Sequence, residues 1–202
     1  MERLIRGMVG YLLRRQGTHM PGIHRIAIAC LITALPVLCV AGDEVTYTFE
    51  CDTPAGHFSY WTRSVSSTEI EVSGNVTLNA MLTDKKWSPT VLAAFRGDKA
   101  HPKQYGVHVW GIAKTPEFLF VELLKVGGSD RIGLGVIPNR KEPIPFSLRL
   151  EASGLLKVTV AGSDASTELG GDFKPKSFEL SCSTGDFEFK DVTVKEKGPG
   201  PN

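Results

Sequence analysis

The sequence contains few cysteines and no excess of charge of either sign. Four cysteines occur in 202 residues, and 23 basic residues nearly balance 22 acidic ones. No basic arm or cluster of lysines and arginines stands out, which argues against a nucleic-acid partner. No helical period and no internal repeat is sustained along the chain, so helical bundles and repeat arrays are both disfavoured.

The sequence motifs of several enzyme classes are also missing. Neither a serine or cysteine nucleophile motif nor a phosphate-binding loop occurs. The histidines beyond residue 42 lack the spacing of a transition-metal site. Asp84, Asp98 and Asp130 lie one to a predicted loop rather than in a cluster. No cofactor is therefore predicted, and calcium would require these loops to converge in space.

The first 42 residues have the pattern of a secretory signal peptide. Five arginines and one acid precede the apolar run Ile26–Ala41, and polar sequence begins at Asp43. A basic flank, a short apolar core and a small-residue exit are typical of exported proteins. Because the run is shorter than the ~20 residues that span a bilayer, we expect cleavage near residue 42 and no retained membrane span. A retained anchor is the alternative, and Met20 is a possible second start of translation.

The remainder of the chain is long enough for one domain with a hydrophobic core. The five arginines and one glutamate of residues 1–42 leave 18 basic and 21 acidic residues, a net charge of −3. We expect the domain to span residues 43–196 and the Gly/Pro-rich residues 197–202 to be disordered. The predicted location is secreted or periplasmic.

Two cysteines lie beyond the signal peptide, Cys51 and Cys182. The first ends the first predicted strand, and the second lies in the next-to-last one. Exported proteins occupy oxidising compartments, in which disulfides persist. A Cys51–Cys182 disulfide is therefore predicted, with two buried free thiols as the alternative.

Strict alternation of apolar and polar residues predicts antiparallel strands. Residues 146–160 alternate on both sides of a turn at 152–154, which is the pattern of a β-hairpin. Residues 178–194 predict a second hairpin, around a turn at 183–185. Further strands are predicted at residues 45–51, 68–72, 74–82, 90–96, 105–113 and 118–126. A turn is predicted at 52–56, and an irregular crossing with one short strand at 57–67. About ten strands with Gly/Pro-rich loops predict an all-β, two-sheet antiparallel sandwich, most simply a jelly roll.

One pattern of apolar residues resembles a known superfamily. The order F-x-L-x-L-x-x-x-G-x-x-x-V-x-V-x-G at Phe146–Gly162, followed by Phe187–Val194, is similar to the concanavalin A-like lectin/glucanase superfamily. The resemblance covers about the last third of the domain. It implies a jelly-roll fold and a function among lectins, laminin-G-like modules and glycan hydrolases, without choosing between them.

The hydrolase branch of that superfamily carries carboxylates on alternate residues of one strand. Here Glu69 and Glu71 alternate, but Ile70 and Val72 between and beside them would face the core. The two glutamates are therefore expected on a solvated face. Glu122 stands alone in its strand, so no catalytic residue is assigned.

Four polar or aromatic residues within apolar strands form the first candidate site: Arg96, His108, Trp110 and Glu122. On one face of a sheet they would make a polar-aromatic groove suited to carbohydrate. The simpler interpretation, which the sequence favours, places Trp110 in the core and pairs Arg96 with Glu122. Trp61 and Trp87, together with Tyr60, are the second candidate set, unless they only plug the ends of the sandwich.

The predicted function is that of an exported, non-enzymatic module that binds a carbohydrate or a cell-envelope component, with a glycan or envelope polysaccharide as the expected partner. One alternative is a glycan-active hydrolase or lyase whose acid residues are unidentified. Another is a structural module with no small-molecule site. Two carboxylates about 5–10 Å apart in an open groove would favour the enzyme.

Overall fold

The computed structural model describes residues 45–98, 103–126, 131–170 and 173–198, which belong to one compact unit of residues 40–202. These described residues form ten antiparallel strands and no helix. The strands are β1 (Val45–Ser64), β2 (Ile70–Met81), β3 (Thr90–Arg96), β4 (Gln104–Gly111), β5 (Phe118–Val126), β6 (Arg131–Pro138), β7 (Ile144–Leu150), β8 (Leu155–Val160), β9 (Ser163–Glu168) and β10 (Ser177–Glu196).

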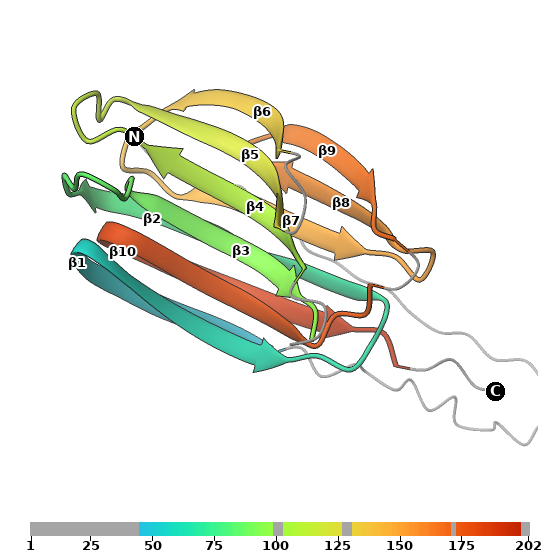
Figure 1. Cartoon of the computed structure of the whole chain (residues 1–202). Coiled ribbons are helices and arrows are strands. Elements are labelled where there is room, and N and C mark those ends of the chain that lie inside the picture. The colour runs from blue at the N-terminus through green and yellow to red at the C-terminus, as the bar shows by residue number, and fades with distance from the viewer. Residues whose placement is uncertain (1–44, 99–102, 127–130, 171–172, 199–202) are drawn as a thin grey trace, which may run out of the picture. The chain divides into compact units, whose positions relative to one another are not determined.

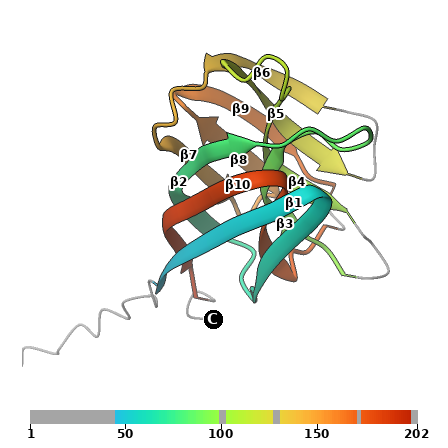
Figure 2. The ribbon, with the colours of Figure 1, turned by 90° about the vertical axis from the view of Figure 1, so that its left-hand side faces the viewer.

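The strands form one continuous sheet, which folds into two layers, sheet A and sheet B, that share β10 and β1. Sheet A has the order β6-β5-β4-β3-β10, and sheet B has the order β9-β8-β7-β2-β10. Ser177–Ser183 of β10 pairs with β3, whereas Gly185–Glu196 pairs with β2. β1 pairs with β10 in both sheets. Because β6 and β9 also contact each other, the strands nearly close around one core (Figures 1 and 2).

β1 and β10 bend together where they pass from one sheet to the other. In β1, the pairing register shifts between Thr53 and Phe58. In β10, Thr184 has a φ of 60°, and a Cβ on the next residue, Gly185, would lie 2.4 Å from the carbonyl oxygen of Ala80. Both strands double back at the left-hand end of Figure 1. Strands commonly change sheets through such irregular, tightly bent segments.

Alternate residues of the two sheets point into a single core. Each fully buried Leu or Phe contributes roughly 1.5–3 kcal/mol of transfer free energy. The largest fully buried side chains come from both sheets and from both parts of β10: Phe95, Phe178, Phe187, Phe189, Ile70, Leu78, Leu119, Leu123, Leu148, Leu156, Leu180 and Val72.

The predicted all-β jelly-roll sandwich of about ten strands is confirmed, but several local predictions are wrong. The predicted hairpin at 178–194 is one strand, β10, whose halves pair with β3 and β2 rather than with each other. The predicted turn at 52–56 belongs to β1, and so does most of the crossing at 57–67, for which only one short strand was predicted. The strands predicted at 68–72 and 74–82 form the single strand β2, and β6 and β9 were not predicted.

The predicted disulfide between Cys51 and Cys182 is present, and the free-thiol alternative is wrong. Their Cα atoms lie 6.3 Å apart, and the residues are separated by 131 positions. Thr53 Oγ1 lies 2.8 Å from Cys182 Sγ in the same buried region. The disulfide thus fastens β1 to β10 beside their common bend.

The predicted signal peptide and most of the predicted tail lie outside the described residues. Among the residues that the structure does describe, no helix has the length and apolarity needed to cross a membrane.

Candidate functional site

The outer face of sheet A, which points away from the core, carries a row of polar and aromatic side chains. His108 of β4 lies between Leu92 of β3 and Glu122 of β5. Trp110, two residues along β4, lies between Thr90 and Phe120. Because side chains alternate across a strand, all of these residues share one face. The structure thus brings His108, Trp110 and Glu122 together.

His108 connects two neighbouring strands through hydrogen bonds. Its Nδ1 lies 3.2 Å from Glu122 Oε2, and its Nε2 lies 2.5 Å from Thr90 Oγ1. Arg131 Nη1 donates a hydrogen bond of 3.3 Å to the same oxygen of Glu122. Since an ionised carboxylate can only accept, the neutral imidazole carries its proton on Nδ1. Its Nε2 then accepts a hydrogen bond from the hydroxyl of Thr90.

Burial lowers the pKa of His108 below its ordinary value of 6.5, although the Glu122 carboxylate opposes the shift. The imidazole is therefore neutral at pH 7. The unfolded chain takes up this proton as the pH falls through 6.5, whereas the folded chain resists it. Acid consequently favours unfolding at this position.

We expect the free energy of unfolding to fall between pH 7.5 and pH 5 by more in the wild type than in His108→Gln. One proton sets a limiting slope of about 1.4 kcal/mol per pH unit. Urea unfolding at several pH values measures the difference. His57→Gln, at an exposed position, is the control and should follow the wild type. Parallel pH profiles of wild type and His108→Gln would contradict this assignment.

Trp110 contributes its ring, rather than its N–H group, to this face. The indole stacks on Phe120 with ring centroids 4.3 Å apart and an interplanar angle of 17°. Its Nε1 is enclosed and has no hydrogen-bond partner among the described residues. The result is a flat aromatic pair beside the polar His108–Glu122 group.

Arg96 lies on the same face but belongs to a second polar group. Its guanidinium forms an ion pair with Glu179 of β10, which is 2% exposed and also accepts a hydrogen bond of 3.3 Å from Gln104. Leu92, the cross-strand partner of His108, lies four residues from Arg96 along β3. Four residues of strand correspond to about 13 Å, so the two groups are separate.

The interpretation favoured by the sequence, Trp110 in the core and Arg96 paired with Glu122, is wrong on both points. Trp110 alternates with the core residue Val109 and therefore points outward. Arg96 pairs with Glu179, whereas Glu122 pairs with His108 and Arg131. Burial of a charged side chain requires a partner, but the sequence does not say which partner it is.

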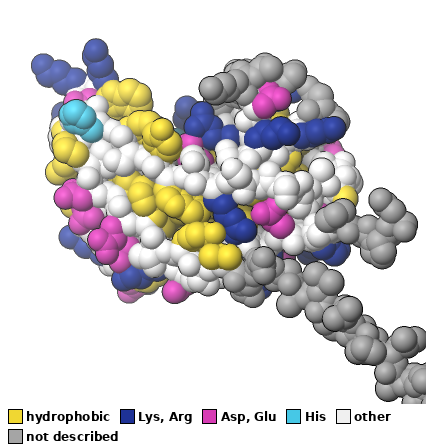
Figure 3. Space-filling model, turned by 90° about the horizontal axis from the view of Figure 1, so that it is seen from below, with side chains coloured by type: hydrophobic (Ala, Val, Ile, Leu, Met, Phe, Trp, Pro, Cys, Tyr) yellow, Lys and Arg dark blue, Asp and Glu magenta, His cyan; other side chains and the backbone are white. Residues whose placement is uncertain are grey.

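The second candidate set is not brought together. Trp61 points to the core side of β1, where its ring centroid lies 4.6 Å from that of Tyr47. Tyr60 points to the opposite side and stacks on Phe58, with ring centroids 5.4 Å apart. These exposed rings belong to β1, and Figure 3 shows hydrophobic side chains gathered on the face of the molecule that carries this strand. Trp87 lies in the loop between β2 and β3.

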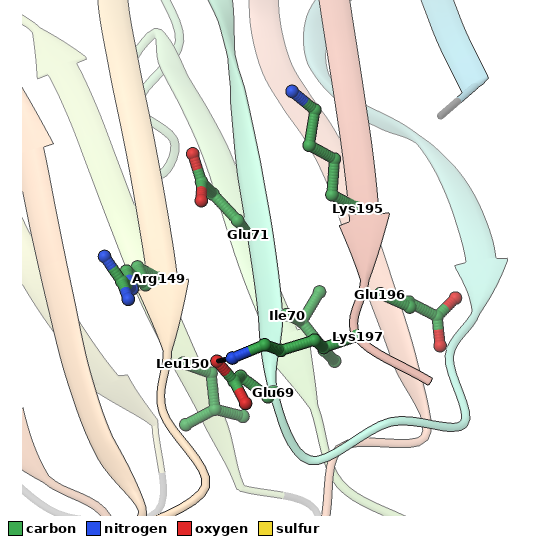
Figure 4. Close-up of a pocket in the computed structure, with 8 residues that line it drawn as sticks. All are labelled: Glu69, Ile70, Glu71, Arg149, Leu150, Lys195, Glu196 and Lys197. Carbon is green, nitrogen blue, oxygen red and sulfur yellow. Dashed lines mark hydrogen bonds and ion pairs between the residues drawn. The ribbon is translucent and has the colours of Figure 1, made fainter. Parts of the chain in front are cut away.

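A cavity of about 390 Å³ lies between the ends of β2, β7 and β10, and its charges are already balanced. In the sheet, Glu71 of β2 lies opposite Arg149 of β7 on one side and opposite Lys195 of β10 on the other. Lys197 Nζ lies 2.6 Å from Glu69 Oε1. Figure 4 shows Glu196 pointing away from these residues, and it accepts hydrogen bonds from the Ser66 and Ser67 backbone. Glu69 and Glu71 thus lie on a solvated face, as the alternation predicts, and this cavity has no unbalanced charge to recruit a ligand.

No group of three or more His, Cys, Asp or Glu side chains that could hold a metal ion occurs in the described part of the chain. Asp130 lies outside that part. Asp84 accepts hydrogen bonds from the backbone of its own loop, at Lys86 and Trp87.

The residues of this face that the sequence did not single out include Thr90, Gln104, Phe120, Arg131 and Glu179. Phe120 could have been found, because it alternates with Glu122 in the same strand. Glu179 alternates with Ser177 and Ser181, a pattern that indicates an ordinary solvated face. Its partner Arg96 lies 83 positions away, and no local signal links the two.

Fold and face together define an antiparallel jelly-roll sandwich whose sheet A carries a polar-aromatic outer surface. No family model and no curated protein matches the chain. Similar solved structures exist, and they agree with the predicted jelly-roll fold.

Similar structures with TM-scores just above 0.5 include an alginate lyase, a CBM2 module and a fructofuranosidase. An alginate lyase from Pseudomonas aeruginosa has a TM-score of 0.52 and 16% identity, covering 65% of this chain and 66% of the lyase. The CBM2 module of the evolved Dit protein of Lactobacillus casei BL23 phage J-1 has a TM-score of 0.51 and 9% identity, covering 73% and 74%. A fructofuranosidase from Schwanniomyces occidentalis has a TM-score of 0.51 and 8% identity, covering 76% of this chain but 33% of that protein.

Proposed function

We propose that this protein is a non-enzymatic carbohydrate-binding module that uses the outer face of sheet A. The observation that carries the proposal is the stacked pair Trp110–Phe120 next to the His108–Glu122–Arg131 group. Aromatic rings stack on sugar rings, and fixed polar groups beside them orient the hydroxyls. The fold supports this proposal, because the similar structures include a carbohydrate-binding module and enzymes named for alginate and fructofuranosides.

The proposed place of action is outside the cytoplasm, in a secreted or periplasmic location. The disulfide between Cys51 and Cys182 supports it, since such bonds persist in oxidising compartments. In such a compartment the protein would encounter its proposed ligand, a glycan or an envelope polysaccharide.

A glycan-active enzyme is the second candidate, and the hydrogen-bonded series Thr90–His108–Glu122 favours it. A neutral imidazole oriented by a carboxylate has the chemistry of a general base. Against a two-carboxylate hydrolase, Glu179 is buried and paired with Arg96, which leaves Glu122 as the accessible carboxylate among the described residues of this face. Release of reducing ends or unsaturated sugars that is lost in His108→Gln would favour the enzyme.

We expect Glu122→Gln to weaken glycan binding about tenfold, which corresponds to about 1.4 kcal/mol. The substitution keeps the shape of the side chain but removes the charge that holds His108 and Arg131. A glycan array with the full chain identifies a ligand, and calorimetry then compares the variants.

Glu71→Gln, on the outer face of sheet B, is the matched control and should bind like the wild type. Trp110→Ala tests the ring, with a thermal melt to verify folding. If the wild-type chain binds no glycan on the array, the structural-module alternative is favoured instead.

A further inference from the structure

A second cleft opens at the end of the sandwich where β1 and β10 bend. It has a volume of about 870 Å³ and lies between the loops at residues 82–89 and 112–117, next to Gly56 of β1. A smaller hollow of about 130 Å³ adjoins it, and Leu82 and Ile112 are among the residues that line it. Figure 1 shows both loops at the left-hand end of the molecule, and Figure 3 shows Lys and Arg side chains projecting from that end.

Three lysines line this cleft: Lys85, Lys86 and Lys114. None of the three forms an ion pair with another described residue. The cavity beside Glu71 differs in this respect, because its positive and negative side chains alternate. Unbalanced positive charge around a concave surface attracts an anion.

The acid in the cleft, Asp84, serves its own loop. Its Oδ1 accepts the backbone N–H groups of Lys86, at 2.8 Å, and Trp87, at 3.0 Å. These hydrogen bonds lower the pKa of the Asp84 carboxyl, which therefore stays ionised. Asp84 holds the positions of the adjacent lysine and tryptophan, and the three ammonium groups outnumber its single charge.

The cleft also presents an open aromatic ring. Trp87 is 54% exposed, and none of the ring contacts between described aromatic residues involves it. An indole at the wall of a cleft offers a flat apolar surface to a ligand. Trp87 therefore does not plug the end of the sandwich.

We propose that this cleft binds an acidic saccharide, whose carboxylate or sulfate groups pair with Lys85, Lys86 and Lys114 while a sugar ring stacks on Trp87. The volume lies within the range of small-ligand sites. An anionic membrane would also attract lysines, but the lysines and Trp87 line a hollow, which suits a discrete ligand better than a flat bilayer. The cleft is separate from the face around His108, and the binding of a ligand in the cleft does not require that face.

The test is calorimetry of the full chain with an oligogalacturonate and with a neutral oligosaccharide of equal length. We expect K85Q/K86Q/K114Q to weaken binding of the oligogalacturonate about tenfold or more, since each exposed ion pair adds a modest increment. Binding of the neutral oligomer should not change. Trp87→Ala should weaken binding of the oligogalacturonate as well.

The matched control is K141Q/K174Q/K176Q, which removes the same charge from exposed lysines outside the cleft. Equal losses in both triple variants would overturn the proposal, because net charge alone would explain them. The proposal would also be overturned if the chain bound vesicles containing one quarter phosphatidylserine more tightly than it binds the oligogalacturonate, and if K85Q/K86Q/K114Q lost that vesicle binding. The glycan that the array identifies for the face around His108 should bind K85Q/K86Q/K114Q as it binds the wild type, so failure of one site can be distinguished from failure of the other.

Discussion

Reduction of the Cys51–Cys182 disulfide should cause a large loss of stability. The bond joins residues 131 positions apart. Closing a loop of that size restricts the unfolded chain, and the chain-entropy model gives about 4–5 kcal/mol for the effect. For a domain of this size each 1 kcal/mol shifts the melting temperature by about 2–4 °C, so we expect a decrease of about 8–20 °C.

Thermal melts of the oxidised and the fully reduced wild type measure this loss. The double variant C51A/C182A is the second measurement, because it removes both sulfurs and adds the cost of two small cavities. Both residues are buried in the core, so the double variant should melt below the reduced wild type. Equal melting temperatures for the oxidised and the reduced protein would contradict this prediction, because the bond would then not restrict the conformations of the unfolded chain.

The position of this bond explains both what the sequence predicted and what it did not. Strand alternation at β7 and β8 predicted a hairpin correctly, because both strands and their turn are contiguous in the chain. At Ser183-Thr184-Gly185 the same type of signal was misleading. A residue with positive φ followed by glycine serves a tight turn and a bent strand equally well. The partners of β10 decide between the two, and they are distant in sequence.

The candidate site was predictable as a face but not as a set of contacts. Period-two alternation places His108 and Trp110 on one side of β4, and Glu122 on one side of β5. Which residues then meet depends on the register between strands. The pairing of β3 with β10, for example, sets Ala94 opposite Glu179 and so brings Glu179 within reach of Arg96. Nothing in either segment alone specifies that register.

The two polar groups of sheet A therefore have different physical roles. Glu122 is partly exposed and shares its charge with His108 and the exposed Arg131, so a ligand can compete for those hydrogen bonds. Glu179 is enclosed, so its ion pair with Arg96 stabilises the fold and does not contact a ligand. Loss of one partner should accordingly affect binding in the first group and stability in the second.

Arg96→Met should destabilise the protein by about 3 kcal/mol, the lower end of the range for breaking a buried ion pair. The lower end applies because the Arg96 side chain is 46% exposed, whereas that of Glu179 is 3% exposed. The variant leaves a buried carboxylate without its arginine, although the hydrogen bond from Gln104 remains. Urea unfolding measures the loss.

The double variant R96M/E179L separates the cost of the unpaired charge from the worth of the ion pair. Replacement of both partners by apolar side chains leaves no charge to desolvate, and such replacements are often neutral or stabilising. We therefore expect the double variant to recover most of the stability that Arg96→Met loses. If the double variant is as unstable as Arg96→Met, packing of the arginine stem rather than the charge of Glu179 determines the loss, and the role assigned to this pair is wrong.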